Sequence, residues 1–342
     1  MSLINKIANF KSSVKYHKFM VLYSFYKEFI NLLLLKQFGR KTINIIILPE
    51  HIGDVLAFTP FAEKLKKEDK NAYNVWLIKP TYLSILSENN FIDKCISISC
   101  DGVAEKFSNL KKFNIFDVRF NGNNFCSICH TERKYQTIDN SFTLDNYYEY
   151  GSLLEIFSQI AKKPMKKEDW FPTLNIPKNL IDNLAKYNLP TNYICIHTTS
   201  NDINREWQNE KWLVFLNRLI ETHNIKIVQI GLNDTLKFSN TNYFDLCGKL
   251  SLMETAQVIQ KSDLFVGIDS GPAHFANALK VKSLILLGKY RNIIQYMPFS
   301  GNFALGINSK IMYDSTIKSA DIEAENVYFE TIKLLNKTLI SN

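Results

Sequence analysis

The residues from 264 to 279 combine groups that bind phosphate. The apolar run Leu264–Ile268 stops at Asp-Ser-Gly-Pro (269–272), and a helix rich in alanine follows. A strand that turns directly into a helix presents backbone N–H groups and the positive end of the helix dipole to an anion. Ser270 is expected at the N-cap, Gly271 lets a ligand approach the backbone, and His274 lies one turn into the helix. The segment predicts a phosphate site, and its plainer interpretation is an ordinary capped turn.

A second segment, near the start of the chain, supplies a carboxylate. Ile43–Leu48 predicts a buried strand, and an amphipathic helix runs through Leu65 after it. Asp54 lies where the strand passes into the helix, and ligands of open α/β sheets bind at the carboxyl ends of strands. A carboxylate in that position suits proton abstraction from a bound hydroxyl, with helix capping as the alternative role.

Together these segments resemble glycosyltransferase family 9, the bacterial heptosyltransferases of lipopolysaccharide assembly. The resemblance is carried by I-G-D-x-x-x-x-T-P at 52–60, D-S-G-x-x-H-x-A-x-A-L at 269–279, and a G-x-x-S-L segment at 248–252. It covers roughly Ile43 to Gly288, about three quarters of the chain. It implies an α/β chain of the GT-B fold, in which two Rossmann-like domains face a central cleft, and chemistry that needs no metal or other cofactor.

The resemblance also implies roles for individual residues. Asp54 is the expected general base, and Gly53 and Thr59 are expected on the acceptor side. The residues expected to bind the donor are Thr198, Thr199, Ser200, Arg205, Asp234, Leu250, Asp269, Ser270, Gly271 and His274.

Three departures from the family pattern leave the donor sugar open. Arg205 stands where the family usually has lysine, and Asp234 is shorter than the usual glutamate at the ribose. Lys289-Tyr290 replaces the usual G-P-T.

The order of the predicted elements defines the domains. Strands alternate with helices, which predicts parallel sheets covered on both faces. The boundaries expected are an N-terminal extension over 1–41, an acceptor-side domain over 42–165 and a donor domain over 178–320. Three prolines between 163 and 177 mark the junction, and the helix in 321–342 is expected to cross back onto the first domain. The polar loop 120–140 is expected to bind the acceptor.

The positive charge is concentrated in the N-terminal extension. The formal net charge is +8, and residues 1–41 carry +7 of it. A nucleic-acid-binding surface would spread basic residues over the folded body, so no nucleic acid is expected. The segment is rich in aromatic and aliphatic residues but is interrupted by Lys27 and Glu28, which disfavours a membrane span. It predicts either a helix on an anionic membrane surface or a helix packed within the protein or against another protomer.

Six cysteines are expected to be reduced, since no export signal is recognised. Cys126, Cys129 and His130 form C-x-x-C-H, which occurs in haem attachment, but attachment requires export. Free thiols in a loop are the preferred interpretation, and a zinc site that adds Cys95 or Cys100 stays open.

The function expected is therefore inverting transfer of a sugar, heptose by family implication, from a nucleotide-sugar to lipopolysaccharide or a related lipid-linked glycan. ADP-heptose is the implied donor, and the protein is expected in the cytoplasm, at the inner membrane surface. Two alternatives stay open: a GT-B-like nucleotide-sugar epimerase, and a catalytically idle sugar-nucleotide-binding scaffold. The oligomeric state is left open.

Overall fold

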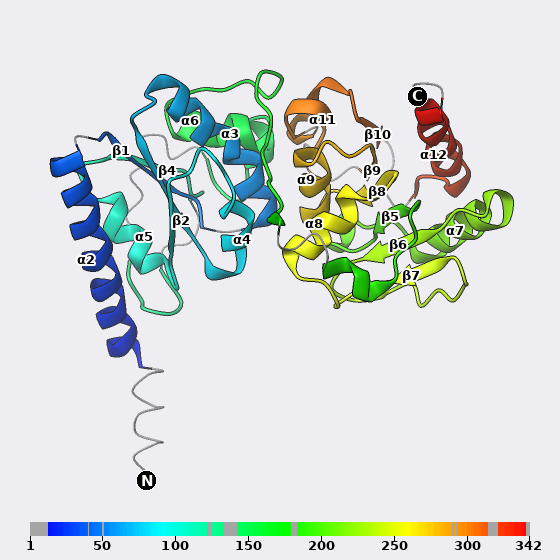
Figure 1. Cartoon of the computed structure of the whole chain (residues 1–342), viewed down its shortest axis with the longest axis horizontal. Coiled ribbons are helices and arrows are strands. Elements are labelled where there is room, and N and C mark those ends of the chain that lie inside the picture. The colour runs from blue at the N-terminus through cyan, green and yellow to red at the C-terminus, as the bar shows by residue number, and fades with distance from the viewer. Residues whose placement is uncertain are drawn as a thin grey trace, which may run out of the picture. The chain divides into compact units, whose positions relative to one another are not determined.

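The protein folds into two α/β units, seen here in a computed structural model (Figure 1). The first unit comprises Met1–Tyr147 and Glu155–Met165, and the second comprises Tyr148–Leu154 and Lys166–Asn342. The residues described are 13–39, 41–49, 51–121, 125–132, 142–178, 183–288, 291, 293–297, 299–313 and 321–339. Lys289, Tyr290 and much of the loop 120–140 lie outside them.

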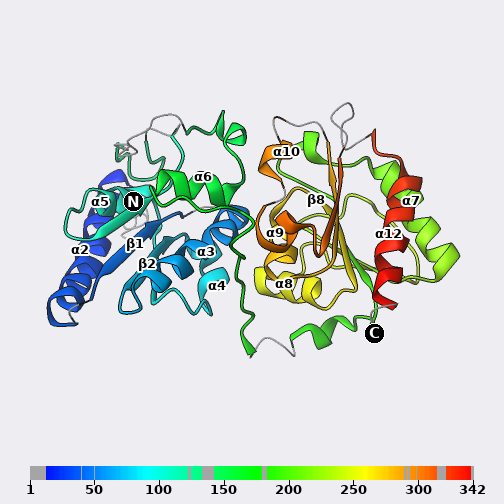
Figure 2. The ribbon, with the colours of Figure 1, turned by 90° about the horizontal axis from the view of Figure 1, so that it is seen from above.

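The first unit is built on a four-stranded parallel sheet in the order β3-β2-β1-β4. Its strands are β1 (Ile43–Ile47), β2 (Tyr73–Ile78), β3 (Lys94–Ser97) and β4 (Asn114–Asp117). Its helices are α2 (Val14–Gly39), α3 (Ile52–Glu68), α4 (Leu83–Leu86), α5 (Asp101–Ser108) and α6 (Leu153–Ile160). In both ribbon views α2 and α5 lie on one side of this sheet, and α3 and α4 lie on the other (Figures 1 and 2). The sequence had predicted β1, as Ile43–Leu48, to within one residue.

Three asparagines fix the register of this sheet. Asn44 lies opposite both Asn74 and Asn114 in the parallel ladders of β1. The Asn44 amide donates to Asn74 Oδ1 at 2.9 Å, and the Asn114 amide donates to Asn44 Oδ1 at 2.9 Å. Asn44 and Asn74 are buried, so a slip by one residue would leave their amides without partners, which costs more than the bonds themselves contribute.

The N-terminal segment packs as a helix of the first unit. Val21, Phe25 and Leu32 of α2 are buried in the core formed by β1, β2 and α5. Phe25 makes an edge-to-face contact with Phe107 at 5.1 Å, and Glu28 pairs with Lys94 of β3. The expectation of a separate extension over 1–41 therefore fails for the described part, since α2 helps to build the domain core. None of the described helices combines the length and hydropathy needed to cross a membrane.

The second unit is built on a six-stranded parallel sheet in the order β10-β9-β8-β5-β6-β7. Its strands are β5 (Ile194–His197), β6 (Ile227–Ile230), β7 (Tyr243–Asp245), β8 (Leu264–Ile268), β9 (Ser283–Leu287) and β10 (Ser309–Tyr313). The sequence had not predicted β7 and β10. Its α-helices are α7 (Asn209–His223), α8 (Leu252–Gln260), α9 (Gly271–Ala278), α10 (Ile293–Tyr296), α11 (Gly301–Leu305) and α12 (Ala324–Leu339). Short 3-10 turns cover Asn183–Tyr187 and Ile203–Arg205.

The C-terminal helix α12 stays with the second unit, so the expected crossing to the first domain is wrong. It lies beside α7 in both ribbon views (Figures 1 and 2), and Val327 and Tyr328 join the core formed by α7 and the strands. His223 at the end of α7 hydrogen-bonds the Tyr328 hydroxyl at 2.8 Å. The Trp207 indole donates to the Ile322 carbonyl at 2.8 Å, which ties the start of this segment to the same face.

Candidate active site

The strand order of the second unit places one crevice at the carboxyl ends of β5 and β8. The chain winds outward in one direction from β5 through β6 to β7, and in the other from β8 through β9 to β10. The crevice between the two starting strands is the topological switch point, where open α/β sheets bind ligands. Thr198, Thr199 and Ser200 follow β5, and Asp269 and Ser270 follow β8. Sequence motifs seventy residues apart are therefore brought together by one pair of neighbouring strands.

Ser270 connects these two strands. It occupies the N-cap of α9, but its side chain makes no capping hydrogen bond. Its hydroxyl lies 3.0 Å from His197 Nδ1 and 3.2 Å from the Ile268 carbonyl instead. The sequence had predicted a capping serine. Pro272 has no N–H, and the Ala273 N–H donates to the Ser270 carbonyl at 3.0 Å. The first turn of α9 therefore offers an anionic ligand the Gly271 N–H and the positive end of the helix dipole.

Arg205 forms an ion pair with Asp269 across this crevice. Arg205 Nη1 lies 3.3 Å from Asp269 Oδ2 and 3.5 Å from the Asp269 carbonyl. Burial raises the pKa of the Asp269 carboxyl, and the Arg205 charge offsets part of that rise. Asp269 is 2% exposed. Its carboxylate therefore pairs with Arg205 and has little exposed surface for a direct contact with the donor.

Thr198 and Thr199, which follow β5, have different surroundings. The Thr198 hydroxyl is buried and has no hydrogen-bond partner among the described residues. Such a group is costly unless a ligand or water pairs with it, so it is a candidate contact for a bound donor. Thr199 Oγ1 would lie 3.7 Å from a Cβ added at Gly231, at the end of β6. The Ser200 backbone N–H donates to Glu206 Oε1 at 2.6 Å, which fixes the turn.

His274 lies within α9 as an uncharged ring. It is 4% exposed, and its ring stacks on Phe299 with centroids 3.5 Å apart. Burial, together with the nearby Arg205 charge, lowers its pKa to about 3. A neutral, covered imidazole does not supply positive charge to a phosphate, so any contact of His274 with the donor would have to be made as a neutral ring.

Asp234 and Leu250 lie in loops beyond the neighbouring strand β6. The Asp234 carboxylate accepts from the N–H groups of Leu236 and Lys237, both at 3.0 Å, and so caps its own turn. Leu250 is half-buried, just before a capping box in which Ser251 and Glu254 start α8. The Gly248 N–H donates to the Gly231 carbonyl at 2.9 Å, so the two loops lie next to each other.

Aromatic residues near Arg205 had no recognisable signal in the sequence. Tyr148 and Tyr296 lie 5.0 Å apart by ring centroid. Burial lowers the pKa of Arg205, but the Asp269 carboxylate, with smaller contributions from the two tyrosines, outweighs burial and raises it. Arg291 lies over the Tyr148 ring at 5.3 Å. These residues come from three separate segments, so only the tertiary fold assembles them.

In the first unit, Asp54 lies in the first turn of α3, directly after the carboxyl end of β1. Its side chain and Gly53 are half-buried, so a ligand can reach them. The N-cap His51 adopts a left-handed φ of 61°, an uncommon conformation for a residue other than glycine. Strained backbone of this kind is often found at functional sites.

Thr59 is placed differently from the prediction. It is fully buried, and its hydroxyl donates to the Leu56 carbonyl at 2.8 Å. Pro60 lies inside α3 and lacks the N–H that would otherwise satisfy this carbonyl. The Thr59 hydroxyl thus replaces the backbone hydrogen bond that Pro60 removes from the helix, which explains the Thr-Pro pair of the motif. Because Thr59 is fully buried, it has no surface for an acceptor.

Arg119 was missed by the sequence analysis, although it lies at the switch point of the first sheet, where β4 pairs with β1. It forms two hydrogen bonds to Asp117, at 2.7 and 2.6 Å, and lies 3.5 Å from Glu105. Its Nη1 atom is buried and has no partner among the described residues. A cation at that position is a candidate contact for an anionic substrate.

A pocket of about 280 Å³ lies at the opposite, amino-terminal end of β5 and β6, lined by residues such as Asn192, Lys226 and Asp263. None of the candidate site residues lines it, and we assign it no role.

Comparison with known proteins identifies the class. Residues 152–302 match the model of glycosyltransferase family 9 (heptosyltransferase). Lipopolysaccharide heptosyltransferase 3 of Escherichia coli (strain K12) is 22% identical over 330 residues, which cover 83% of this chain and 95% of that protein.

Solved structures show the same fold. A glycosyl transferase family 9 protein from Veillonella parvula aligns with a TM-score of 0.66 at 15% identity, over 86% of this chain and 97% of its own. ADP-heptose lps heptosyltransferase II of E. coli aligns with a TM-score of 0.66 at 14% identity, over 87% and 99%. The two parallel sheets thus form the GT-B fold. The family match and the curated relatives make the protein a glycosyltransferase. Within that class, residues 152–302 are similar to glycosyltransferase family 9.

Proposed function

We propose that the protein is an inverting glycosyltransferase that moves heptose from a nucleoside diphosphate donor, ADP-heptose, to lipopolysaccharide or a related lipid-linked glycan. The observation that carries the proposal is the crevice between β5 and β8, where Arg205 and the N-terminus of α9 meet. The donor and the acceptor class come from the similarity to the named heptosyltransferases.

The diphosphate of the donor would bind at the first turn of α9 and the Thr198 hydroxyl. The donors there are the Gly271 N–H, which the Ser270 side chain does not cap, and the Thr198 hydroxyl, which has no partner among the described residues. Arg205, held by Asp269, supplies the positive charge that stabilises the leaving diphosphate. Charged donors in a partly buried site stabilise developing charge more than they would in water.

Asp54 would act as the general base. Its carboxylate accepts the proton of the acceptor hydroxyl while that oxygen attacks the anomeric carbon. The bond from the anomeric carbon to the diphosphate breaks, and the nucleoside diphosphate leaves with both electrons. Attack from the face opposite the leaving group inverts the configuration.

Arg205→Gln tests the donor site. Loss of a charged hydrogen bond costs about 1.5–3 kcal/mol, so affinity for ADP-heptose by calorimetry should fall roughly 10- to 150-fold. Arg218→Gln is the matched control, because Arg218 lies on α7 and pairs with Glu325. Equal affinity in a folded Arg205→Gln protein would exclude this crevice as the donor site.

Asp54→Asn tests the base. Turnover should fall by about 10²–10⁴ while donor affinity stays near the wild-type value. Asp69→Asn, at the C-cap of the same helix, should keep turnover. If Asp54→Asn turns over within a few-fold of wild type, another group takes the proton.

We also infer that α2 holds the protein on the anionic cytoplasmic surface of the inner membrane. The face opposite its buried residues carries an exposed apolar stripe at helical spacing: Phe19, Tyr23, Tyr26, Ile30, Leu34 and Phe38. Exposed Lys15, Lys18 and Lys27 lie near this stripe on the same helix. Each lysine near an anionic bilayer contributes about 1 kcal/mol, and the stripe adds apolar burial.

Truncating the helix would remove core residues, so substitutions on the exposed stripe test this role. Tyr26→Ser, Ile30→Ser and Leu34→Ser combined should abolish co-sedimentation with phosphatidylglycerol vesicles and leave the unfolding midpoint nearly unchanged. Val214→Ser, an exposed apolar position on α7, is the control. Undiminished vesicle binding by the triple variant would refute the membrane role of α2.

A further inference from the structure

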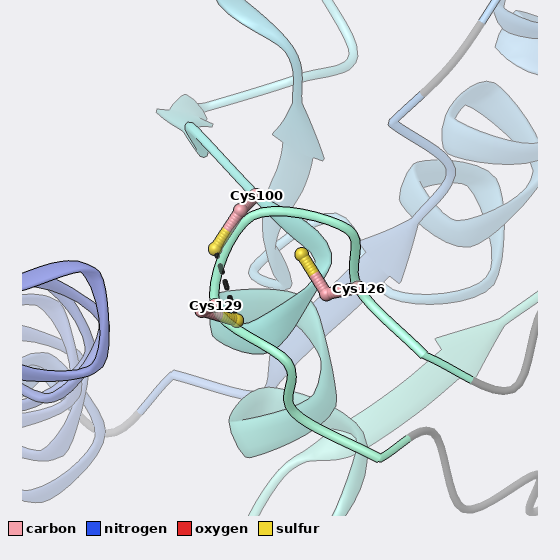
Figure 3. Close-up of side chains that lie close together, drawn as sticks. All are labelled: Cys100, Cys126 and Cys129. Atoms are coloured by element: carbon pink, nitrogen blue, oxygen red, sulfur yellow. Dashed lines mark hydrogen bonds between the residues drawn. The ribbon is translucent and has the colours of Figure 1, made fainter. Parts of the chain in front are cut away.

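Three cysteines of the first unit meet at one point that the proposed reaction does not use. Cys100 lies at the N-cap of α5, and Cys126 and Cys129 lie in the loop after β4. All three are buried, and their sulfurs lie within 4.8 Å of one another, with Cys100 Sγ 3.5 Å from Cys129 Sγ. Figure 3 shows the three sulfurs pointing toward one another from two separate segments.

The loop that carries Cys126 and Cys129 folds as a tight hairpin. Phe125 and Glu132 form an antiparallel bridge, and the Cys126 N–H donates to the Thr131 carbonyl at 3.1 Å. The His130 N–H donates to the Cys126 carbonyl at 2.9 Å. A turn of this kind, with two residues between the cysteines, brings both sulfurs to the same side, which is the ligand spacing of structural zinc sites.

Backbone N–H groups also aim at the sulfurs. Cys126 Sγ accepts hydrogen bonds from the N–H groups of Ile128 and Cys129 within the hairpin, and from that of Asp101 at the start of α5. Donors of this kind orient a metal-bound thiolate and offset its negative charge. Because Asp101 belongs to the other segment, the two segments are already joined around this sulfur.

The spacing of the sulfurs fits one metal ion. Sulfurs bound to one tetrahedral zinc at about 2.3 Å lie about 3.8 Å apart, within the range that the cluster shows. The backbone of α5 at Gly102 lies close against the hairpin. A Cβ added at Gly102 would lie 2.5 Å from Cys129 Sγ and 2.9 Å from Thr131 Oγ1, so there is no room for a side chain there.

We propose that Cys100, Cys126 and Cys129 bind a zinc ion that fastens the hairpin 125–132 to the N-terminus of α5. Burial of all three ligands is typical of a structural zinc site. Each thiol gives up its proton on binding, and three thiolates leave the fourth position of a tetrahedral ion to the adjacent His130 or to a solvent oxygen.

Metal content tests the site directly. The full-length chain, expressed without a metal-binding tag in zinc-supplemented medium and dialysed against metal-free buffer, should contain about one zinc per chain by mass spectrometry. Cys100→Ser, Cys126→Ser and Cys129→Ser should each lose most of it. Cys95→Ser in β3 and Cys247→Ser in the second unit are matched controls outside the cluster and should keep it. His130→Ala distinguishes the two candidates for the fourth ligand. Loss of zinc from this variant would support the His130 imidazole, and retention of zinc would support a solvent oxygen.

A second measurement does not depend on folded variants. Cobalt added to the chelator-stripped wild-type protein should give the intense near-ultraviolet absorption of thiolate-to-cobalt charge transfer, and zinc should displace it. Wild-type protein without zinc and without this absorption would overturn the proposal. A Cys100–Cys129 disulfide in protein purified under reducing conditions would overturn it as well.

Discussion

Two buried histidines of the second unit should make its stability fall as the pH drops below neutrality. Burial lowers the pKa of His197 to about 4 and, with the Arg205 charge, that of His274 to about 3, whereas both titrate near 6.5 in the unfolded chain. The unfolded state therefore binds more protons between these values. The stability is fully present above about pH 6.5 and is lost progressively as the pH falls toward 4.

The size of this loss follows from the pKa values. At pH 5 each histidine costs about 2 kcal/mol relative to neutral pH, and the pair costs about 4 kcal/mol if the two are independent. Urea unfolding of the full chain at about pH 7.5 and pH 5 measures the difference. His197→Asn or His274→Asn should remove roughly half of the pH dependence, because asparagine does not titrate, even if each variant is less stable at neutral pH.

His223→Asn provides the control, because His223 lies exposed at the end of α7 and hydrogen-bonds Tyr328. It should leave the pH dependence of the wild-type protein in place. A wild-type free energy of unfolding that is the same at both pH values, or an unchanged slope in both asparagine variants, would refute the reasoning that burial keeps these rings neutral.

Three substitutions separate structural from binding roles. Thr59→Val should lower the free energy of unfolding by about 1–3 kcal/mol, because the Leu56 carbonyl is left unpaired, and the acceptor KM should not change. Thr198→Val should leave the urea midpoint near the wild-type value, since its hydroxyl has no partner to lose, while affinity for ADP-heptose falls about 2- to 13-fold. Leu32→Ala should destabilise the protein by about 2–5 kcal/mol, and Leu34→Ala, exposed on the same helix, should have little effect; equal effects would contradict the packing of α2.

The sequence was informative where local pattern and chemistry agree. Apolar runs such as Ile43–Leu48 predicted the buried parallel strands, and Asp-Ser-Gly-Pro predicted the turn into α9. It failed where long-range packing decides. The short strand β7 is only half-buried and lacks an apolar run, and α12 is amphipathic enough to suit either domain until its contacts with α7 are known.

The same limit applied to the site. The residue types predicted that Arg205 and Asp269 belong to the site. The sequence did not show that the Asp269 carboxylate forms an ion pair with Arg205. Thr59 was assigned to the acceptor because it belongs to the motif. The motif does not show whether a hydroxyl binds a ligand or replaces the backbone hydrogen bond that a proline removes. Arg119 and Tyr148 carried no motif, and only strand order and packing placed them.

The division of the chain into units has a consequence for how the protein is made. The first unit needs Glu155–Met165, but Tyr148–Leu154, which precede them, belong to the second unit. Phe157 packs on Phe58 and Phe120, so a ribosome must release the chain beyond this point before the first core can close. No single cut yields two intact domains, and a gene fragment ending at residue 147 encodes a core that lacks one of its own helices. The two units are therefore translated as interleaved segments of one chain, although each has its own sheet.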